Sequence, residues 1–279
     1  MSEDVLVVIG VGGMGESIAR RLGAGKQVLL ADFSEEALER VASALRGEGF
    51  AVSTQKVDVS SRESLASLAD AAAALGDVRQ VAHTAGLSPA QAPVEAILRV
   101  DLAGVAYSLE EFGRVIAPGG AGLVIASMAG SMAAGSLPAE LEGALSLTPA
   151  DDLLSLPFVQ PEALPNPGAA YSMSKRANQL RVQSASLAWG KRSARVNSIS
   201  PGVISTPMGQ QELDSESGVA MRAMISASGT ARVGTPSDIT NAAAFLLGPD
   251  ASFITGTDLL VDGGVIAALR SGALQLPTA

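Results

Sequence analysis

The stretch that decides the fold is Val5-Leu6-Val7-Val8-Ile9-Gly10-Val11-Gly12-Gly13-Met14-Gly15. Its five aliphatic residues predict a buried β-strand, and an amphipathic helix is expected over 13–24. The glycines between them form a G-x-G-x-x-G pattern, whose missing side chains let a pyrophosphate approach the backbone N–H groups at a helix N-terminus. A tight turn between packed elements is the alternative. We assign the dinucleotide contact to Gly10, Gly12, Gly13, Met14 and Gly15.

A carboxylate ends the next apolar run. Asp32 follows Leu29-Leu30-Ala31, 22 positions after Gly10. A carboxylate at this place accepts hydrogen bonds from the adenosine ribose and repels a 2′-phosphate, which favours NAD over NADP. Asp32 also suits the cap of the helix that starts after Ser34, and the two roles are compatible. Asp32 and its neighbour Phe33 are assigned to the cofactor site.

Apolar β-branched runs alternate with Ala-rich helical stretches along the chain. Strand-helix alternation predicts a doubly wound parallel sheet of about seven strands with helices on both faces, a Rossmann fold. No Ser- or Pro-rich linker divides the units, so residues 1–279 are expected to form a single domain. The predicted strands are 5–9, 27–31, 51–57, 78–83, 121–126, 194–199 and 258–261, and the predicted helices are 13–24, 34–47, 61–75, 93–116, 169–189 and 236–247.

Composition narrows the function classes. With 47% hydrophobic and 17% charged residues the chain is expected to fold, and its net charge of −9 argues against nucleic-acid or anionic-membrane partners. It has no cysteine and one histidine, so we expect no disulfide, thiolate nucleophile or metal site. The first residues lack the basic region of a signal peptide, so a cytoplasmic protein is expected.

Tyr171 and Lys175 stand four residues apart on a predicted helix, so they share one face. Free tyrosine titrates near ~10, and a nearby cation favours the phenolate. A shift of about three pH units needs roughly 4 kcal/mol of differential interaction. The pair alone is weak evidence, because Tyr-x-x-x-Lys also occurs on solvated helix faces.

With these motifs in order, the chain resembles the short-chain dehydrogenase/reductase family along nearly its whole length. The matching segments are Asp58-Val59, His83-Thr84-Ala85-Gly86, Ser127, Tyr171 with Lys175, Pro201-Gly202-Val203 and Thr206. The resemblance implies catalysis by Ser127, Tyr171 and Lys175. It also implies cofactor contacts from Asp58, Val59, Thr84, Ala85, Gly86, Tyr171, Lys175, Pro201, Gly202, Val203 and Thr206, and a homotetramer or homodimer.

The implied activity is the NAD-dependent interconversion of a secondary alcohol and a ketone. Tyr171 would exchange the proton, Ser127 would hydrogen-bond the substrate oxygen, and Lys175 would lower the Tyr171 pKa and hold the nicotinamide ribose. Two other functions stay open. One is an NAD-using sugar-nucleotide epimerase or dehydratase, and the other is a non-catalytic dinucleotide-binding protein.

Asp101 departs from the family pattern, because it stands where the fourth catalytic residue is usually Asn. It could hold a relay water, or offset part of the effect of Lys175 on Tyr171. The glycine loop is also one residue shorter than usual, with Ile9 in place of Thr. Both departures leave dinucleotide binding as the expectation.

Two segments are expected to shape the substrate pocket. The proline-rich insertion 131–168 separates Ser127 from Tyr171 and is predicted to act as a lid, while 203–230 is predicted to be the substrate-binding loop. His83 is given a structural or nucleotide-adjacent role. Methionines near the site suggest an apolar, even steroid-like, substrate: Met128, Met132, Met173, Met208, Met221 and Met224.

Overall fold

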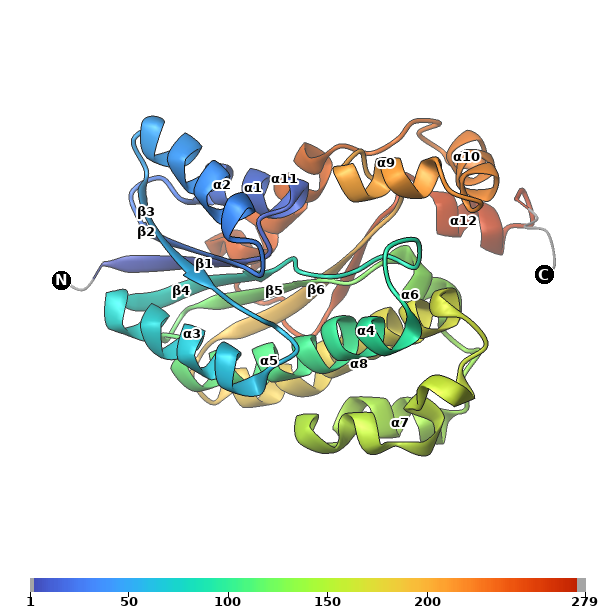
Figure 1. The fold of residues 1–279 in the computed structure, drawn as a ribbon, viewed down its shortest axis with the longest axis horizontal. Helices are drawn as coiled ribbons and strands as arrows, with labels where there is room; N and C mark the ends of the chain where they lie inside the picture. The colour runs from blue at the N-terminus through green and yellow to red at the C-terminus, as the bar shows by residue number, and fades with distance from the viewer. Residues whose placement is uncertain (1–2, 275–279) are drawn as a thin grey trace.

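The computed structural model describes residues 3–274 and is built around a seven-stranded sheet of order β3-β2-β1-β4-β5-β6-β7 (Figure 1). Every neighbouring pair of strands is parallel. The order reverses between β1 and β4, the place where ligands bind in open α/β sheets. The strands are β1 (Asp4–Ile9), β2 (Gln27–Asp32), β3 (Ala51–Lys56), β4 (Asp77–His83), β5 (Ala121–Ile125), β6 (Arg195–Pro201) and β7 (Asp258–Val261).

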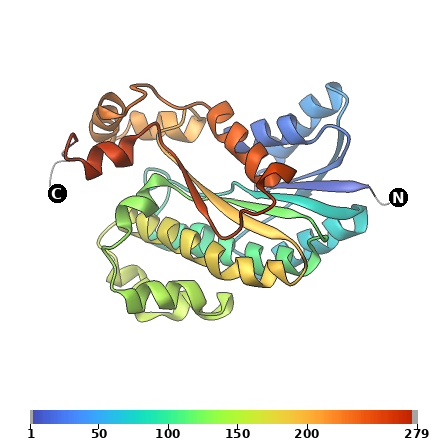
Figure 2. The same ribbon diagram turned by 180° about the vertical axis from the view of Figure 1, so that it is seen from behind.

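Helices cover both faces of the sheet, as predicted. In Figures 1 and 2, α1 (Gly13–Leu22), α2 (Glu35–Gly47) and α11 (Pro236–Leu247) lie on one face, and α3 (Arg62–Leu75), α5 (Gly104–Val115) and α8 (Pro167–Gly190) lie on the other. The predicted helix 93–116 is three elements, because the π-helical segment η1 (Leu98–Ala103) separates α4 (Val94–Ile97) from α5. Within residues 3–274, none of the helices combines the length and apolarity needed to cross a bilayer.

The first strand is buried on both sides, as a central parallel strand must be. Leu6 and Val8 pack in the apolar cluster beneath α1, α2 and α11, whereas Val5, Val7 and Ile9 belong to the cluster on the other face. This burial anchors β1. The glycine loop at its carboxyl end therefore starts from a rigid support.

The insertion packs against the outer side of α8 (Figure 2). It contains the end of α6 (Met128–Ala133), all of α7 (Ala139–Leu147) and the 3₁₀ segments Ala150–Ser155, Pro157–Val159 and Pro161–Ala163. Proline stands at the start of each 3₁₀ segment, where its fixed φ suits a first turn. Leu145, Leu153 and Val159 form a third apolar cluster with residues of α4, η1 and α8.

This cluster overturns one expectation about the pocket. Met173 is 6% exposed and packs within the cluster, so the prediction that it lines the substrate pocket is wrong. The reason is that the insertion covers the side of α8 on which Met173 lies. The other side of the same helix carries the candidate catalytic residues.

Leu153→Ala is expected to lower the free energy of unfolding by about 2–5 kcal/mol, because Leu153 is fully buried in this cluster. The control is Leu147→Ala, at a leucine of the same insertion that is 74% exposed, with an expected change within about 0.5 kcal/mol. Denaturant unfolding measures both. Equal changes in the two variants would show that the insertion does not pack on the body of the protein.

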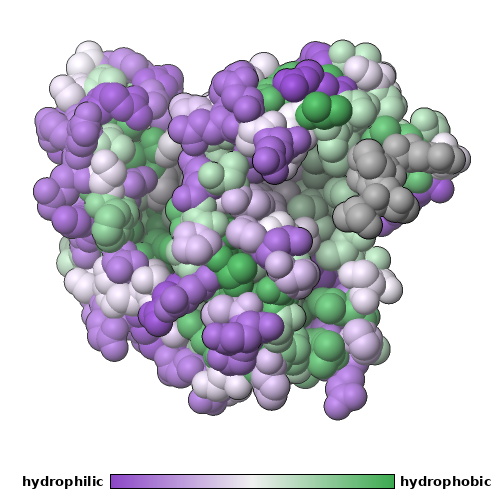
Figure 3. All heavy atoms as spheres, turned by 45° about the vertical axis from the view of Figure 1, so that its right-hand side comes forward, coloured by the Kyte–Doolittle hydropathy of each residue, from purple (hydrophilic) through white to green (hydrophobic). Residues whose placement is uncertain are grey.

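The short segment Pro249–Ala251 follows α11 near the amino ends of the strands, where Arg195 at the start of β6 donates to the carbonyl oxygen of Gly248. Three further helices gather at the carboxyl ends of the strands, on the right of Figure 1. They are α9 (Pro207–Leu213), α10 (Gly218–Ala227) and α12 (Val265–Arg270). Figure 3 looks toward this side and shows apolar side chains exposed among polar ones. The segment predicted to bind substrate, 203–230, contains α9 and α10 and lies over this edge of the sheet.

Candidate active site

The glycine loop is shaped by close approaches that only glycine permits at two positions. Gly10 has φ +90°, and a Cβ there would lie 2.5 Å from the backbone nitrogen of Ala85. A Cβ on Gly15 would lie 1.9 Å from the carbonyl oxygen of Gly10. By contrast, a Cβ on Gly12 would meet nothing within 4 Å. The loop is thus tightly packed at Gly10 and Gly15 and open at Gly12, just before the N-terminus of α1. This opening fits the pyrophosphate of a dinucleotide.

Side chains from two other strands fix this loop. Thr84, after β4, donates its hydroxyl to the carbonyl oxygen of Gly10 at 2.6 Å. Asp32, at the end of β2, accepts from the backbone N–H of Val11 at 2.8 Å and from that of Ser34 at 2.9 Å. The carboxylate predicted to face the adenosine ribose therefore sits directly beside the glycine loop. Phe33 is 69% exposed next to it.

The segment after β6 meets the glycine loop from the opposite side. Thr206 caps α9 by accepting from the N–H of Gly209, and a Cβ on Gly13 would lie 3.1 Å from the Thr206 methyl group. Asp58 and Val59 follow β3, where the Asp58 carboxylate accepts from the backbone and hydroxyl of Ser60. The predicted cofactor residues thus come from the carboxyl ends of several neighbouring strands.

Caps set the positions of the three candidate catalytic residues. Ser127 ends β5 in an extended conformation and caps α6 by accepting from the N–H of Ala129 at 3.1 Å. Asn166 caps α8 by accepting from the N–H of Ala169, with Pro167 at the first position. Tyr171 and Lys175 follow on successive turns of α8.

One cavity of about 290 Å³ joins these residues. Ser127, Tyr171 and Lys175 all line it. Of the predicted cofactor residues, Met14, Thr84, Gly86, Pro201, Gly202, Val203 and Thr206 also line it. The methionines in its wall are Met14, Met128, Met132, Met208, Met221 and Met224. The insertion contributes Met132 and Gly168, near its two ends, and its role as a lid stays a prediction.

Asp101 lies behind this cavity and pairs with Lys175. Its carboxylate is fully buried, with Oδ1 2.9 Å from the Lys175 ammonium and Oδ2 accepting from the N–H of Leu87 at 3.0 Å. A Cβ on Gly86 would lie 2.6 Å from Oδ1, so glycine is required between the pair and the cavity. Asp101 belongs to the π-helical segment η1, and such turns are frequent at functional sites.

The Asp101–Lys175 pair lies in the low-dielectric interior of the protein. Burial raises the pKa of Asp101, against the attraction of Lys175. Burial alone would lower the pKa of Lys175, but the charges of Asp101 and Tyr171 outweigh it, so the Lys175 pKa lies above its ordinary value. Lys175 is therefore positively charged at neutral pH and is held by Asp101.

The Tyr171 pKa is also raised. Burial of the phenol is the largest cause, while Lys175 and the Ser127 side chain act to lower the pKa and Asp101 acts to raise it. The Lys175 ammonium lies 5.4 Å from the centre of the Tyr171 ring. The contribution of Lys175 has the sign expected from the sequence, but burial and neighbouring carboxylates reverse the net direction. Offsetting the lysine is one of the two roles considered for Asp101.

His83 is buried in β4 and does not line this cavity. Burial, with a contribution from the Lys175 charge, lowers its pKa to about 3, so the ring is neutral at pH 7. It is therefore a poor general base. Among residues 3–274 no cluster of three or more His, Cys, Asp or Glu side chains is arranged to hold a metal ion.

Glu212 is a site residue that the sequence did not indicate. It lies on α9 and lines the cavity. Burial raises its pKa, against the Ser88 side chain and the Lys175 charge. In the sequence it follows two glutamines and is typical of an exposed helix face, and only the path of the substrate segment turns it inward.

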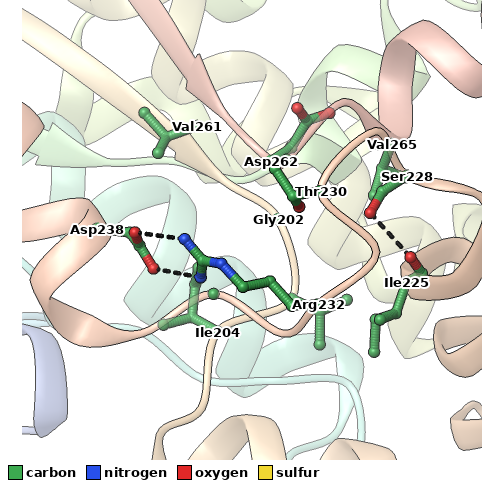
Figure 4. Close-up of a pocket in the computed structure, with 13 residues that line it drawn as sticks. Gly202, Ile204, Ile225, Ser228, Thr230, Arg232, Asp238, Val261, Asp262 and Val265 are labelled. Atoms are coloured by element: carbon green, nitrogen blue, oxygen red, sulfur yellow. Dashed lines mark hydrogen bonds and ion pairs between the residues drawn. The ribbon is translucent and has the colours of Figure 1, made fainter.

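A second cavity, of about 180 Å³, lies between the substrate segment and the ends of β6 and β7 (Figure 4). Arg232 pairs there with both carboxylate oxygens of Asp238 at 2.8 and 2.9 Å, and the Ser228 hydroxyl donates to the carbonyl of Ile225 (Figure 4). The Arg232–Asp238 pair ties the chain just after the substrate segment to α11, whereas the Ser228 bond lies within the segment. Gly202 and Val203 line both cavities, so the turn after β6 divides them.

Known proteins are similar to this chain in sequence and fold. Residues 4–139 match the family described as short chain dehydrogenase, and residues 154–266 match the family described as enoyl-(acyl carrier protein) reductase. The short-chain dehydrogenase/reductase bsc3 of Alternaria brassicicola is 44% identical over 269 residues, which cover 96% of this chain and 98% of that protein. The chain belongs to the short-chain dehydrogenase/reductase family. The recognition made from its motifs is confirmed.

Other short-chain dehydrogenases/reductases agree with this assignment. 3β-Hydroxysteroid dehydrogenase 2 of Eggerthella lenta is 30% identical, with 94% of each chain covered. The structure of an NAD⁺-bound xylitol dehydrogenase superposes with a TM-score of 0.73 at 26% identity, covering 94% of this chain and 98% of that one. Members of the family are oxidoreductases that bind nicotinamide dinucleotides, and the predicted Rossmann fold is confirmed.

Proposed function

We propose that this short-chain dehydrogenase/reductase interconverts secondary alcohols and ketones with NAD(H), using Tyr171 as general acid and base. The observation that supports this is one cavity that Ser127, Tyr171 and Lys175 line together, next to a glycine loop open at Gly12. Acid-base, hydrogen-bonding and cationic groups thus meet where a carbinol oxygen could lie.

Tyr171 and Ser127 act at the substrate oxygen. A bound nicotinamide would supply the hydride acceptor for the carbinol carbon, or the hydride donor for the ketone. The Tyr171 oxygen removes the hydroxyl proton in the oxidation and returns it in the reduction. Ser127 already accepts from Ala129, so its own hydrogen is free to donate to the substrate oxygen as negative charge develops there.

Lys175 acts through its charge. Its ammonium lowers the Tyr171 pKa and would also donate to the ribose of the nicotinamide nucleotide. Asp101 keeps this ammonium protonated inside the protein. Asp32 would hold the adenosine ribose, and the backbone N–H groups beside Gly12 would hold the pyrophosphate.

The substrate is proposed to be apolar around its carbinol carbon. Six methionines line the cavity and can adapt to an irregular apolar surface. The name of the Eggerthella lenta relative, a 3β-hydroxysteroid dehydrogenase, agrees with a cyclic apolar alcohol. A steroid-like substrate is the specific form of this proposal.

The proposal is tested with purified protein, NAD⁺ and a panel of cyclic and steroidal secondary alcohols, by following NADH formation and ketone formation together. Equal amounts of ketone and NADH are expected. Conversion of substrate without net change in NAD would instead indicate an epimerase or dehydratase. Binding of NADH without turnover of any alcohol or ketone would indicate a non-catalytic protein.

The choice of NAD over NADP is proposed to rest on the charge of Asp32. Asp32→Asn keeps the size of the side chain and removes the charge that repels a 2′-phosphate, so the ratio of kcat/KM for NAD⁺ to that for NADP⁺ should fall by about 10–100-fold. Glu35→Gln, at an exposed carboxylate on α2, is the control. An unchanged ratio in Asp32→Asn would contradict this role.

We also propose a cytoplasmic homotetramer, as the family resemblance implies, with a homodimer as the other possibility. Sedimentation equilibrium of the purified protein gives the number of subunits directly. A monomer would contradict both assembly states.

A further inference from the structure

We infer that Glu212 selects alcohols that carry a second hydroxyl group, apart from the one that reacts. This inference rests on the proposed function, because it concerns the substrate of the same cavity. Lys175 and Glu212 are the two charged residues in the cavity wall, and Glu212 supplies the one carboxylate. Lys175 forms an ion pair with Asp101. Glu212 lies on α9, within the substrate segment.

The Glu212 carboxylate has room for a ligand. Glu212 is half-buried, and among residues 3–274 no cation forms an ion pair with its carboxylate. The buried Ser88 hydroxyl lies near enough to this carboxylate to favour its charged form, although it does not itself line the cavity. A carboxylate accepts several hydrogen bonds, so Glu212 can also accept one from a polar group of a substrate in the cavity.

Glu212 lines the same cavity as Tyr171 and Lys175. Its charge contributes to raising the pKa of both Tyr171 and Lys175. The carboxylate therefore lies within electrostatic reach of the catalytic pair but makes no contact that an ion pair or hydrogen bond would require. A single substrate molecule could span from the Tyr171 oxygen to Glu212.

A hydroxyl group fits this place better than an ammonium group. The neighbouring wall residues Met208, Met221 and Met224 cannot solvate a cation, and Lys175 repels one. A neutral hydroxyl donates to the carboxylate without a charge of its own to desolvate. The preferred substrates are therefore diols or other hydroxylated secondary alcohols with an apolar frame.

A purely structural role for Glu212 makes a different prediction. The neighbouring Gln211 already receives a hydrogen bond from Gln91 at 2.7 Å, which ties α9 to the loop after β4. If Glu212 were a further tie of this kind through Ser88, its loss would weaken turnover of every alcohol alike. A specificity role instead changes the ratio between substrates.

The experiment compares cyclohexanol, cyclohexanediols and aminocyclohexanols as substrates of the wild type, Glu212→Gln and Glu212→Ala. The readout is the ratio of kcat/KM for diol to that for cyclohexanol. We expect the wild type to favour diols by about 10-fold or more and Glu212→Ala to reduce the ratio to about 1–3. Glu212→Gln, which keeps an acceptor, should fall between them. Thermal unfolding of each variant checks that it folds.

Glu216→Gln is the matched control, because Glu216 is an exposed carboxylate of the same substrate segment, and its ratio should equal that of the wild type. An equal ratio in the wild type and Glu212→Ala would overturn the inference while leaving the proposed function in place. A preference for aminocyclohexanols over diols would overturn the assignment to hydroxyl. Absence of turnover with every alcohol would overturn the proposed function and the inference with it.

Discussion

Tyr171→Phe is expected to lower kcat for alcohol oxidation by about 10³-fold or more, within the range that general acid-base groups contribute. The change removes one oxygen, the atom that takes the substrate proton, and leaves the ring, which packs against the third apolar cluster. The affinity for NADH, measured by titration of protein fluorescence, should stay within about 2-fold of the wild type because the glycine loop is untouched. A loss of kcat without a loss of cofactor affinity is the signature of the proton-transfer role.

The chain provides a matched control for this variant. Tyr107 is the other of the two tyrosines in the chain and lies on α5, away from the cavity. The Arg62 guanidinium lies 5.8 Å from its ring centre. Tyr107→Phe removes the same atom and should keep kcat within about 2-fold of the wild type. Full activity in Tyr171→Phe would remove the proposed mechanism.

Asp101→Asn is expected to move the acidic limb of the pH profile for alcohol oxidation to lower pH by about one unit. Oxidation needs the phenolate, and the negative charge of Asp101 raises the pKa of Tyr171 and that of Lys175. Removing this charge lets the Tyr171–Lys175 pair lose its proton more easily. Because the two groups titrate together, the shift belongs to the pair as a whole.

The profile of kcat against pH measures this directly. Asp214→Asn, at an exposed carboxylate of the substrate segment, is the control and should leave the profile in place. A profile of Asp101→Asn that coincides with the wild type, or shifts to higher pH, would show that Asp101 does not act on the pair through its charge. It would leave the relay-water role as the explanation of this residue.

The alternation of apolar strand-like runs with helical stretches, together with the glycine loop, allowed the sheet to be predicted. Each of the seven strands was found close to its predicted bounds. For the central strands the reason is that a strand buried on both faces must be a short aliphatic run between breakers. Ser127, Tyr171 and Lys175 could be placed in one site because parallel strands end at the same edge and the motifs keep their order.

Features that depend on the course of the chain in the folded protein could not be predicted. The π-helical turn that carries Asp101 has no distinct composition, and its direct pairing with Lys175 requires the close approach at Gly86. Met173 was misplaced because one helix face looks the same whether a pocket or an insertion covers it. Glu212 was missed for the opposite reason, since a polar helix turn is usually solvated.

The proposed mechanism requires that the carbinol carbon of a substrate bound beside Tyr171 transfer its hydride to the nicotinamide. The most direct measurement uses a secondary alcohol deuterated at its carbinol carbon and mass spectrometry of both products. We predict one deuterium in the reduced cofactor for each ketone formed. Deuterium that stays in the organic product, with no net reduction of NAD⁺, would contradict the account.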